Sequence, residues 1–173
     1  MAKKSKLKKV SLSPTKEHHL GIIKLLLADH RLLRKLMAQV KSSRSTPAKQ
    51  MKAFKELEKS VNSHVKAEEN TFFTLIRNHP KFKDATMEGY EEHRVHENVI
   101  RGLKKVSDKD RRLEQMKIYC EFLEHHLDEE EENLFPRFKK YAALQTKRKI
   151  GKNYVKVRKK TSSDKRGAAR YSD

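Results

Sequence analysis

Two stretches of this sequence, His64-Val-Lys-Ala-Glu68-Glu69 and His126-Leu-Asp-Glu-Glu130-Glu131, decide its fold and its chemistry. Each stretch places a glutamate four residues after a histidine. Residues at positions i and i+4 share one face of an α-helix, so each stretch presents an imidazole and a carboxylate to the same region of space. Two such helices that face each other would supply the ligands of a two-metal site.

The two stretches belong to a longer internal repeat. Asp29-His30-Arg31 is matched by Glu92-His93-Arg94, and the offset of 63 residues between the two histidines is close to the offset of 62 between His64 and His126. We therefore expect two copies of a two-helix unit. Each of the four helices would carry one histidine, and the second helix of each copy would add a glutamate.

Composition favours one helical domain. The chain has 173 residues, of which 38% are charged and 35% hydrophobic, as expected of helices with a narrow buried stripe. Glycine is rare, and no stretch shows the alternation of a β-sheet. Short connections favour antiparallel neighbours. We predict an all-α fold, an up-down-up-down four-helix bundle over residues 13–146.

Caps and prolines predict where the helices begin and end. Ser13-Pro14 and Thr46-Pro47 each pair an N-cap residue with a proline in the first turn. Ser107 with Asp110 resembles a capping box, and Pro136 should kink the last helix. The helices are expected over residues 14–41, 47–77, 84–106 and 107–143.

The net charge of +19 is concentrated at the two ends of the chain. Residues 1–16 carry six lysines and no acid, and residues 147–173 carry eleven Lys or Arg against two Asp. We interpret residues 1–12 and 147–173 as basic, flexible tails. Tails of this kind suit contact with nucleic acid or another anionic surface.

Targeting and redox features favour a cytoplasmic protein. Cys120 is the only cysteine, so no disulfide can form within one chain, and we expect it to be a buried structural thiol. The N-terminus lacks the apolar stretch of a signal peptide, and no run approaches the ~20 apolar residues of a transmembrane helix. The sequence carries no signal for the oligomeric state.

Polar side chains occupy positions where the helical stripes call for apolar ones. These are His30, His64, Glu68, His93, His126 and Glu130. One such histidine is usually a hydrogen-bonded core residue, but an inward carboxylate is costly unless it is paired or bound to a cation. A metal centre explains all of them together. Imidazole and carboxylate ligands without a thiolate suit iron, manganese or zinc, and we favour two iron ions bridged by carboxylates or by an oxygen atom.

Several neighbouring residues stay open at this point. His93 and His96 both face inward; the repeat selects His93, and His96 would be a second-shell partner, an additional ligand or a core histidine. Glu69 and Glu131 follow the candidate glutamates and are expected to face solvent or neighbouring helices.

At these residues the chain resembles the hemerythrin-like family, also called HHE cation-binding domains. The resemblance covers about residues 15–143 and rests on Asp29-His30-Arg31, His64-x-x-x-Glu68-Glu69, Glu92-His93, His126-x-x-x-Glu130-Glu131 and Leu134-Phe135-Pro136. It implies a four-helix bundle with a non-haem di-iron centre. The four histidines would be terminal ligands, and Glu68 and Glu130 would bridge the ions.

The chain departs from the oxygen-carrying hemerythrins. Those proteins have a His-x-x-x-His pair on the third helix and an Asp ligand on the fourth, whereas here His93 and His96 are three residues apart and Glu130 takes the acidic position. This departure favours members that sense oxygen, nitric oxide or iron, or that act in iron–sulfur cluster repair, over simple O₂ carriers.

We therefore expect a non-haem di-iron protein that binds or senses O₂, NO or a related small oxidant such as peroxide, and that is a binding protein rather than an enzyme. Two alternatives stay open. One is a di-iron enzyme, either peroxidase-like or active in iron–sulfur cluster repair. The other is a regulator that docks on nucleic acid through its basic tails.

Overall fold

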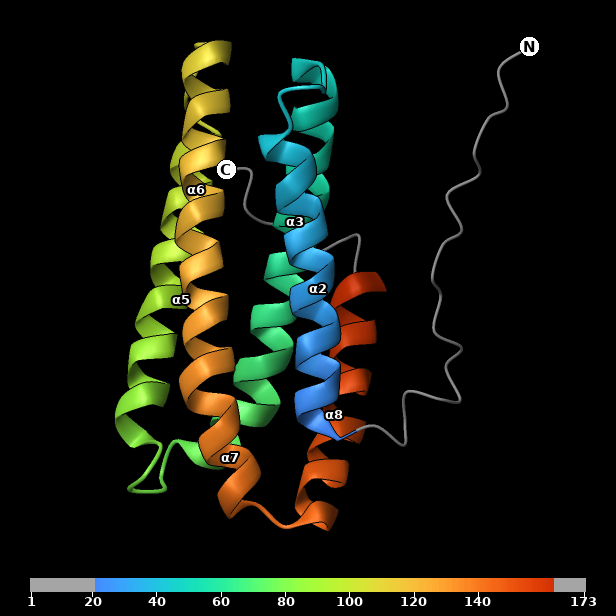
Figure 1. Cartoon of the computed structure of the whole chain (residues 1–173), viewed down its shortest axis with the longest axis vertical. Coiled ribbons are helices and arrows are strands. Elements are labelled where there is room, and N and C mark those ends of the chain that lie inside the picture. The colour runs from blue at the N-terminus through green and yellow to red at the C-terminus, as the bar shows by residue number, and fades with distance from the viewer. Residues whose placement is uncertain (1–20, 164–173) are drawn as a thin grey trace, which may run out of the picture.

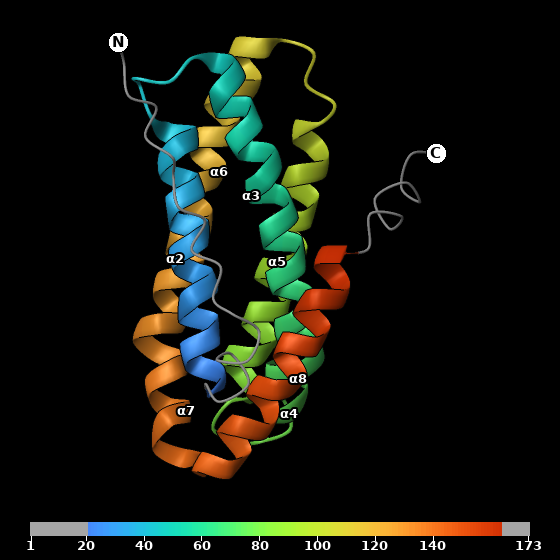
Figure 2. The same ribbon diagram turned by 90° about the vertical axis from the view of Figure 1, so that its right-hand side faces the viewer.

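The computed structural model describes residues 21–163, and every secondary-structure element in that range is helical. The order is α2 (Ile22–Lys41), α3 (Pro47–Glu68), η1 (Glu69–Phe73), α4 (Thr74–Ile76), α5 (Lys83–Leu103), α6 (Lys109–Glu129), η2 (Glu130–Leu134), α7 (Phe135–Tyr141) and α8 (Leu144–Ser163). Figures 1 and 2 show the long helices side by side along the longest axis of the molecule. The all-α class is confirmed, with one long helix more than expected.

Capping explains where two of these helices begin. Thr46 caps α3, because its hydroxyl accepts a hydrogen bond from the Lys49 amide at 3.4 Å. The predicted capping box at Ser107 was wrong: Asp108 is the N-cap of α6, and its carboxylate accepts from the Arg111 amide at 2.7 Å. A carboxylate accepts this bond more strongly than a hydroxyl. The start predicted at Ser13-Pro14 lies outside the described residues.

Two π-helical segments, η1 and η2, interrupt the second helix of each repeat. A π turn holds an extra residue, so the side chains beyond it point in directions that a continuous α-helix would not give them. For this reason Leu75, which lies seven residues after Glu68 and would share its face on a continuous α-helix, is 48% exposed, whereas Phe73 and Ile76 are buried. η2 lies just before Pro136, which cannot donate a backbone hydrogen bond.

Apolar packing forms two separate clusters in the core. On α2, Leu26 belongs to one cluster and Leu33 to the other, and His30 lies between them. On α3, Val61 and Ala67 flank His64 in the same way. The candidate ligands therefore occupy a polar layer between two apolar ones. None of the described helices carries an apolar run long enough to cross a lipid bilayer.

A fifth long helix follows the bundle. We expected a flexible tail from residue 147, which was wrong for residues 147–163, because α8 packs against α2 and α3. Its buried face carries Ile150, Tyr154 and Val155, spaced to form one apolar stripe. Figure 2 shows α8 lying alongside the end of the bundle that holds α4. Residues 1–12 and 164–173 of the expected tails lie outside the described residues.

The docking of α8 should contribute measurably to stability. Ile150→Ala removes a side chain that is 94% buried, so we expect the free energy of unfolding to fall by about 2 kcal/mol in urea denaturation. Lys152→Ala, on the exposed side of the same helix, should change it by less than about 0.5 kcal/mol. Equal effects of the two substitutions would show that α8 is not packed on the bundle.

Candidate metal centre

Four long helices bring the candidate ligands to one layer of the core. His30 comes from α2, His64 and Glu68 from α3, His93 from α5, His126 from α6, and Glu130 from the first position of η2. Each of these side chains belongs to a residue that is at most 5% exposed. The structure thus brings together all the residues proposed from the sequence pattern. Metal binding by these residues stays a proposal.

The ligand atoms form two groups that share one carboxylate. Atoms of His30, His64 and Glu130 lie within 4.8 Å of one another, and so do atoms of His93, His126 and Glu130. Each group thus pairs one histidine from the first helix of a repeat with one from a second helix. A shared carboxylate is an arrangement that suits two adjacent cations.

Glu68 connects the same two groups from another side. Its Oε2 atom lies 3.6 Å from His64 Nε2 and 3.7 Å from His93 Nε2, so it reaches one histidine of each group. Glu130 Oε2 lies 3.3 Å from His30 Nε2. Both carboxylates are therefore placed to bridge.

Three of the four histidines donate a hydrogen bond from Nδ1 directly to a carboxylate. The bonds run from His30 to Glu131 at 2.8 Å, from His93 to Glu69 at 2.8 Å and from His126 to Glu92 at 2.6 Å. An ionised carboxylate only accepts, so Nδ1 must carry the proton. The lone pair of Nε2 is then left facing the centre, as in a metal-ligating histidine.

His64 reaches its acid through a tyrosine of α8. Its Nδ1 donates to the Tyr154 hydroxyl at 3.0 Å, and this hydroxyl donates to Asp29 at 2.5 Å. Arg158, one turn further along α8, holds the same carboxylate with a bond of 2.7 Å from Nε. The fifth helix therefore completes the support of one ligand.

These supporting acids follow the internal repeat. Asp29 and Glu92 precede the first histidine of each copy and serve the second histidine of the same copy. Glu69 and Glu131 follow the two candidate glutamates and serve the first histidine of the opposite copy. From the sequence, Glu69 and Glu131 were expected only to face solvent or neighbouring helices, and no bond to a candidate ligand was predicted for them, although all the supporting acids stand next to candidate ligands in both copies.

Unpartnered buried atoms fit a bound cation. Among the described residues, Nε2 of all four histidines and both carboxylate oxygens of Glu68 and Glu130 are buried without a hydrogen-bond partner. Buried polar groups are nearly always satisfied, so such a cluster around one point requires an explanation. Imidazole nitrogens and carboxylate oxygens, without sulfur, suit iron, manganese or zinc. The donor set and its geometry fit a pair of such ions.

The pKa values of His64 and Glu68 indicate how the site would accept a cation. Burial lowers the pKa of His64 to about 4, so its imidazole is neutral and able to act as a ligand at neutral pH. Burial, together with the neighbouring Glu130 carboxylate, raises the pKa of Glu68 well above its usual range. A cation that binds must therefore displace a proton from this carboxyl group.

His96 lies beside the centre but outside both ligand groups. Its ring centroid is 5.2 Å from that of His126 and 4.5 Å from that of Phe122. Burial lowers its pKa to about 2, so it is neutral. The geometry places His96 as a neighbour that packs against a candidate ligand.

Phe73 packs directly against one of the candidate ligands. Its ring stacks on His93 at a centroid distance of 5.3 Å and an angle of 7°. The stack is close to the backbone of α5, because a Cβ at Gly89 would lie 2.7 Å from Phe73 Cζ. Glycine at this position thus leaves room for the ring that orients His93.

Comparison with known proteins identifies one family. A family model described as the hemerythrin HHE cation binding domain matches residues 21–143, which is well over half of the chain and includes every candidate ligand. No curated protein and no solved structure matches the chain significantly.

The tyrosine bridge to His64 should tune metal binding. Tyr154→Phe removes the hydroxyl between His64 and Asp29, so we expect about tenfold weaker binding of Zn²⁺ in a competition titration with a chromophoric chelator. Tyr141→Phe, at an exposed tyrosine, should leave the affinity unchanged. Wild-type affinity in the Tyr154 variant would show that this hydroxyl does not orient the ligand.

Proposed function

The chain belongs to the hemerythrin HHE cation-binding domain family, and from this premise we propose that it binds two iron ions and uses them to bind or sense O₂, NO or a related small oxidant. Helices α2, α3, α5 and α6 would form the up-down-up-down bundle around the ions. His30 and His64 would hold one ion, and His93 and His126 the other.

The sharing of Glu130 by two histidine pairs is the observation that carries this proposal. A structural core histidine needs only one hydrogen-bond partner, and a single-ion site needs only one such group. Two groups that meet at one carboxylate, with Glu68 close to both, favour a two-ion centre. Nε2 of the four histidines and both carboxylate oxygens of Glu68 and Glu130 are buried without a hydrogen-bond partner among the described residues, which supports the same proposal.

Protein groups around the centre have separable tasks. A di-iron centre supplies one-electron chemistry and coordination positions for a small ligand. The acids on Nδ1 orient the imidazoles, and the apolar clusters on both sides limit the access of water.

The size of the adjoining cavity favours a small ligand over a metabolite. The cavity lined by Glu130 has a volume of about 70 Å³. Sites for drug-sized or metabolite-sized molecules usually occupy about 300–1,000 Å³. A diatomic gas or peroxide would fit in this space, which supports a binding or sensing role over an enzyme with a large organic substrate.

Metal content and reactivity test the proposal directly. We expect about two irons per wild-type chain after anaerobic loading, and a change in the visible spectrum on exposure to O₂ or NO. His30→Ala should keep about one iron, whereas Glu130→Ala should lose most of both because the two groups share this carboxylate. His125→Ala, at an exposed histidine, is the matched control. A colourless, unreactive wild-type protein would contradict the proposal.

Metal affinity should rise with pH. Burial alone would lower the pKa of His126, but the Glu130 and Glu92 carboxylates outweigh it and raise that pKa. The raised pKa of Glu68 adds a second proton that a cation must displace. Each displaced proton should strengthen binding by up to about tenfold per pH unit between about pH 6 and 8. Zn²⁺ titrations with measured proton release would check this, and an affinity independent of pH would contradict it.

A further inference from the structure

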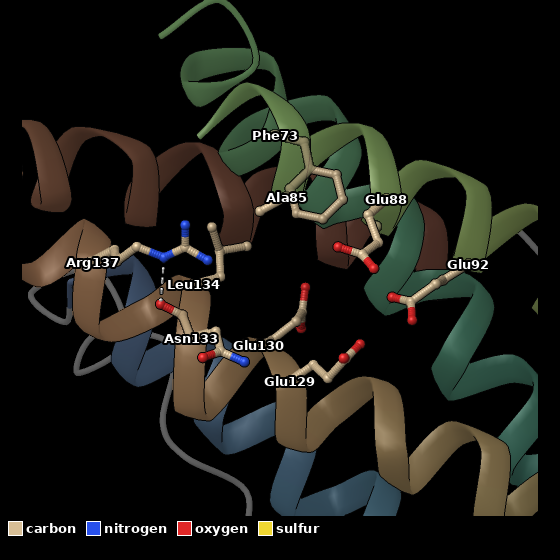
Figure 3. A pocket seen from close by; sticks show the side chains of 10 residues that line it. Phe73, Ala85, Glu88, Glu92, Glu129, Glu130, Asn133, Leu134 and Arg137 are labelled. Atoms are coloured by element: carbon tan, nitrogen blue, oxygen red, sulfur yellow. Dashed lines mark hydrogen bonds between the residues drawn. The ribbon is translucent and has the colours of Figure 1, made fainter. Parts of the chain in front are cut away.

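A small cavity links the candidate centre to the surface. It has a volume of about 70 Å³ and lies between α5 and the junction of α6 with η2. Figure 3 shows the carboxylates of Glu88, Glu92, Glu129 and Glu130 directed towards one space. Glu88 and Glu92 come from α5, and Glu129 and Glu130 from the junction on the other side.

Glu130 is the inner end of this cavity. It is 95% buried, and both of its oxygens lack a hydrogen-bond partner among the described residues. The same side chain belongs to both candidate ligand groups. The cavity therefore opens onto a carboxylate that the two proposed iron positions share.

The outer rim of the cavity is acidic. Glu88 is exposed, the side chain of Glu129 is 39% exposed, and Glu92 is partly buried because it accepts the bond from His126. Carboxylates directed towards one space repel one another, and a cation between them would relieve this repulsion.

The acidic rim lies on a chain whose net charge is positive. The net charge is +19, but residues 1–16 and 147–173 carry +15 of it, so residues 17–146 carry only +4. Acidic side chains at one opening would focus an attractive field there. Arg137 lies on the opposite side of the rim in Figure 3, where its Nε donates to the Asn133 carbonyl oxygen at 3.2 Å.

We propose that this cavity is the route by which divalent cations reach the centre, and that Glu88 and Glu129 form a transient cation-binding site at its mouth. The inference rests on the proposed metal-binding function and adds the path of uptake. The exposed carboxylates at the rim bind weakly because water screens them. Glu130 and the imidazoles behind it bind more strongly, so an ion is drawn inward and does not remain at the rim.

Uptake kinetics of the full chain test this route. Co²⁺, which gains visible absorption on nitrogen and oxygen ligands, is mixed with the apoprotein in a stopped-flow instrument. In Glu88→Gln/Glu129→Gln we expect the uptake rate to fall about tenfold at an ionic strength of about 10 mM, and the difference to disappear near 1 M salt. The amount of Co²⁺ bound per chain at equilibrium should stay at the wild-type value.

Two matched variants isolate the position of the charges. Glu91→Gln/Glu132→Gln removes the same charge from exposed residues of α5 and η2 that do not line the cavity, and it should leave the rate nearly unchanged. Arg137→Gln removes the positive charge from the rim and should accelerate uptake. Circular dichroism confirms that each variant is folded.

The possible outcomes separate this inference from the function on which it rests. Equal slowing by both double variants would overturn the route, because overall charge would then control uptake. A lower Co²⁺ content in Glu88→Gln/Glu129→Gln would also overturn it, because these residues would then be ligands. A wild-type chain that binds no Co²⁺ would overturn the proposed centre itself.

Discussion

Burial in one layer of the core of four imidazoles with an unpartnered Nε2 and two carboxylates without a hydrogen-bond partner is the constraint on which this structure depends. A single buried carboxylate costs several kcal/mol in the absence of a partner. Here the carboxylate oxygens of Glu68 and Glu130 are buried, and no hydrogen-bond donor among the described residues contacts them. The apolar clusters on both sides enclose this layer at lower cost when protons or cations compensate its negative charge, and the proposed pair of iron ions would do so.

The acids that bind Nδ1 of the candidate ligands have a common chemical task. A histidine that binds a cation through Nε2 must keep its proton on Nδ1, and an acceptor on that side holds it there. The consecutive pair Glu68-Glu69 divides this work: the first residue faces the centre, and the second supports His93. The π-helical turn that begins at this pair brings successive side chains closer in angle than an α-helix would. This geometry is consistent with the placement of π segments at functional sites.

The helical periodicity of the sequence made the fold class and the positions of the candidate ligands predictable. The all-α class and the burial of the candidate ligands follow from histidines and glutamates that recur at helical spacing within apolar stripes. The π segments were not predictable in this way, because a pattern with a period of 3.6 residues cannot show an extra residue. Beyond η1 such a pattern would place Leu75 inward, whereas Leu75 is exposed. Helix α8 was missed because its stripe is short and lies among many basic residues. Its anchor is polar, through Tyr154 and Arg158 to Asp29, and hydrophobic patterns do not register such contacts.

The same polar anchor makes the two halves of the internal repeat unequal. His126 meets its acid directly at 2.6 Å, whereas His64 reaches Asp29 through the hydroxyl of Tyr154. A neutral hydroxyl passes on less negative charge than a carboxylate in direct contact, so the His64 imidazole is the weaker electron donor of the two. In the proposed centre, the half that contains His64 would therefore be the half whose properties depend on α8. Duplication of one helical pair can thus give a nearly symmetric set of ligands, while a helix outside the repeat makes the two positions chemically distinct.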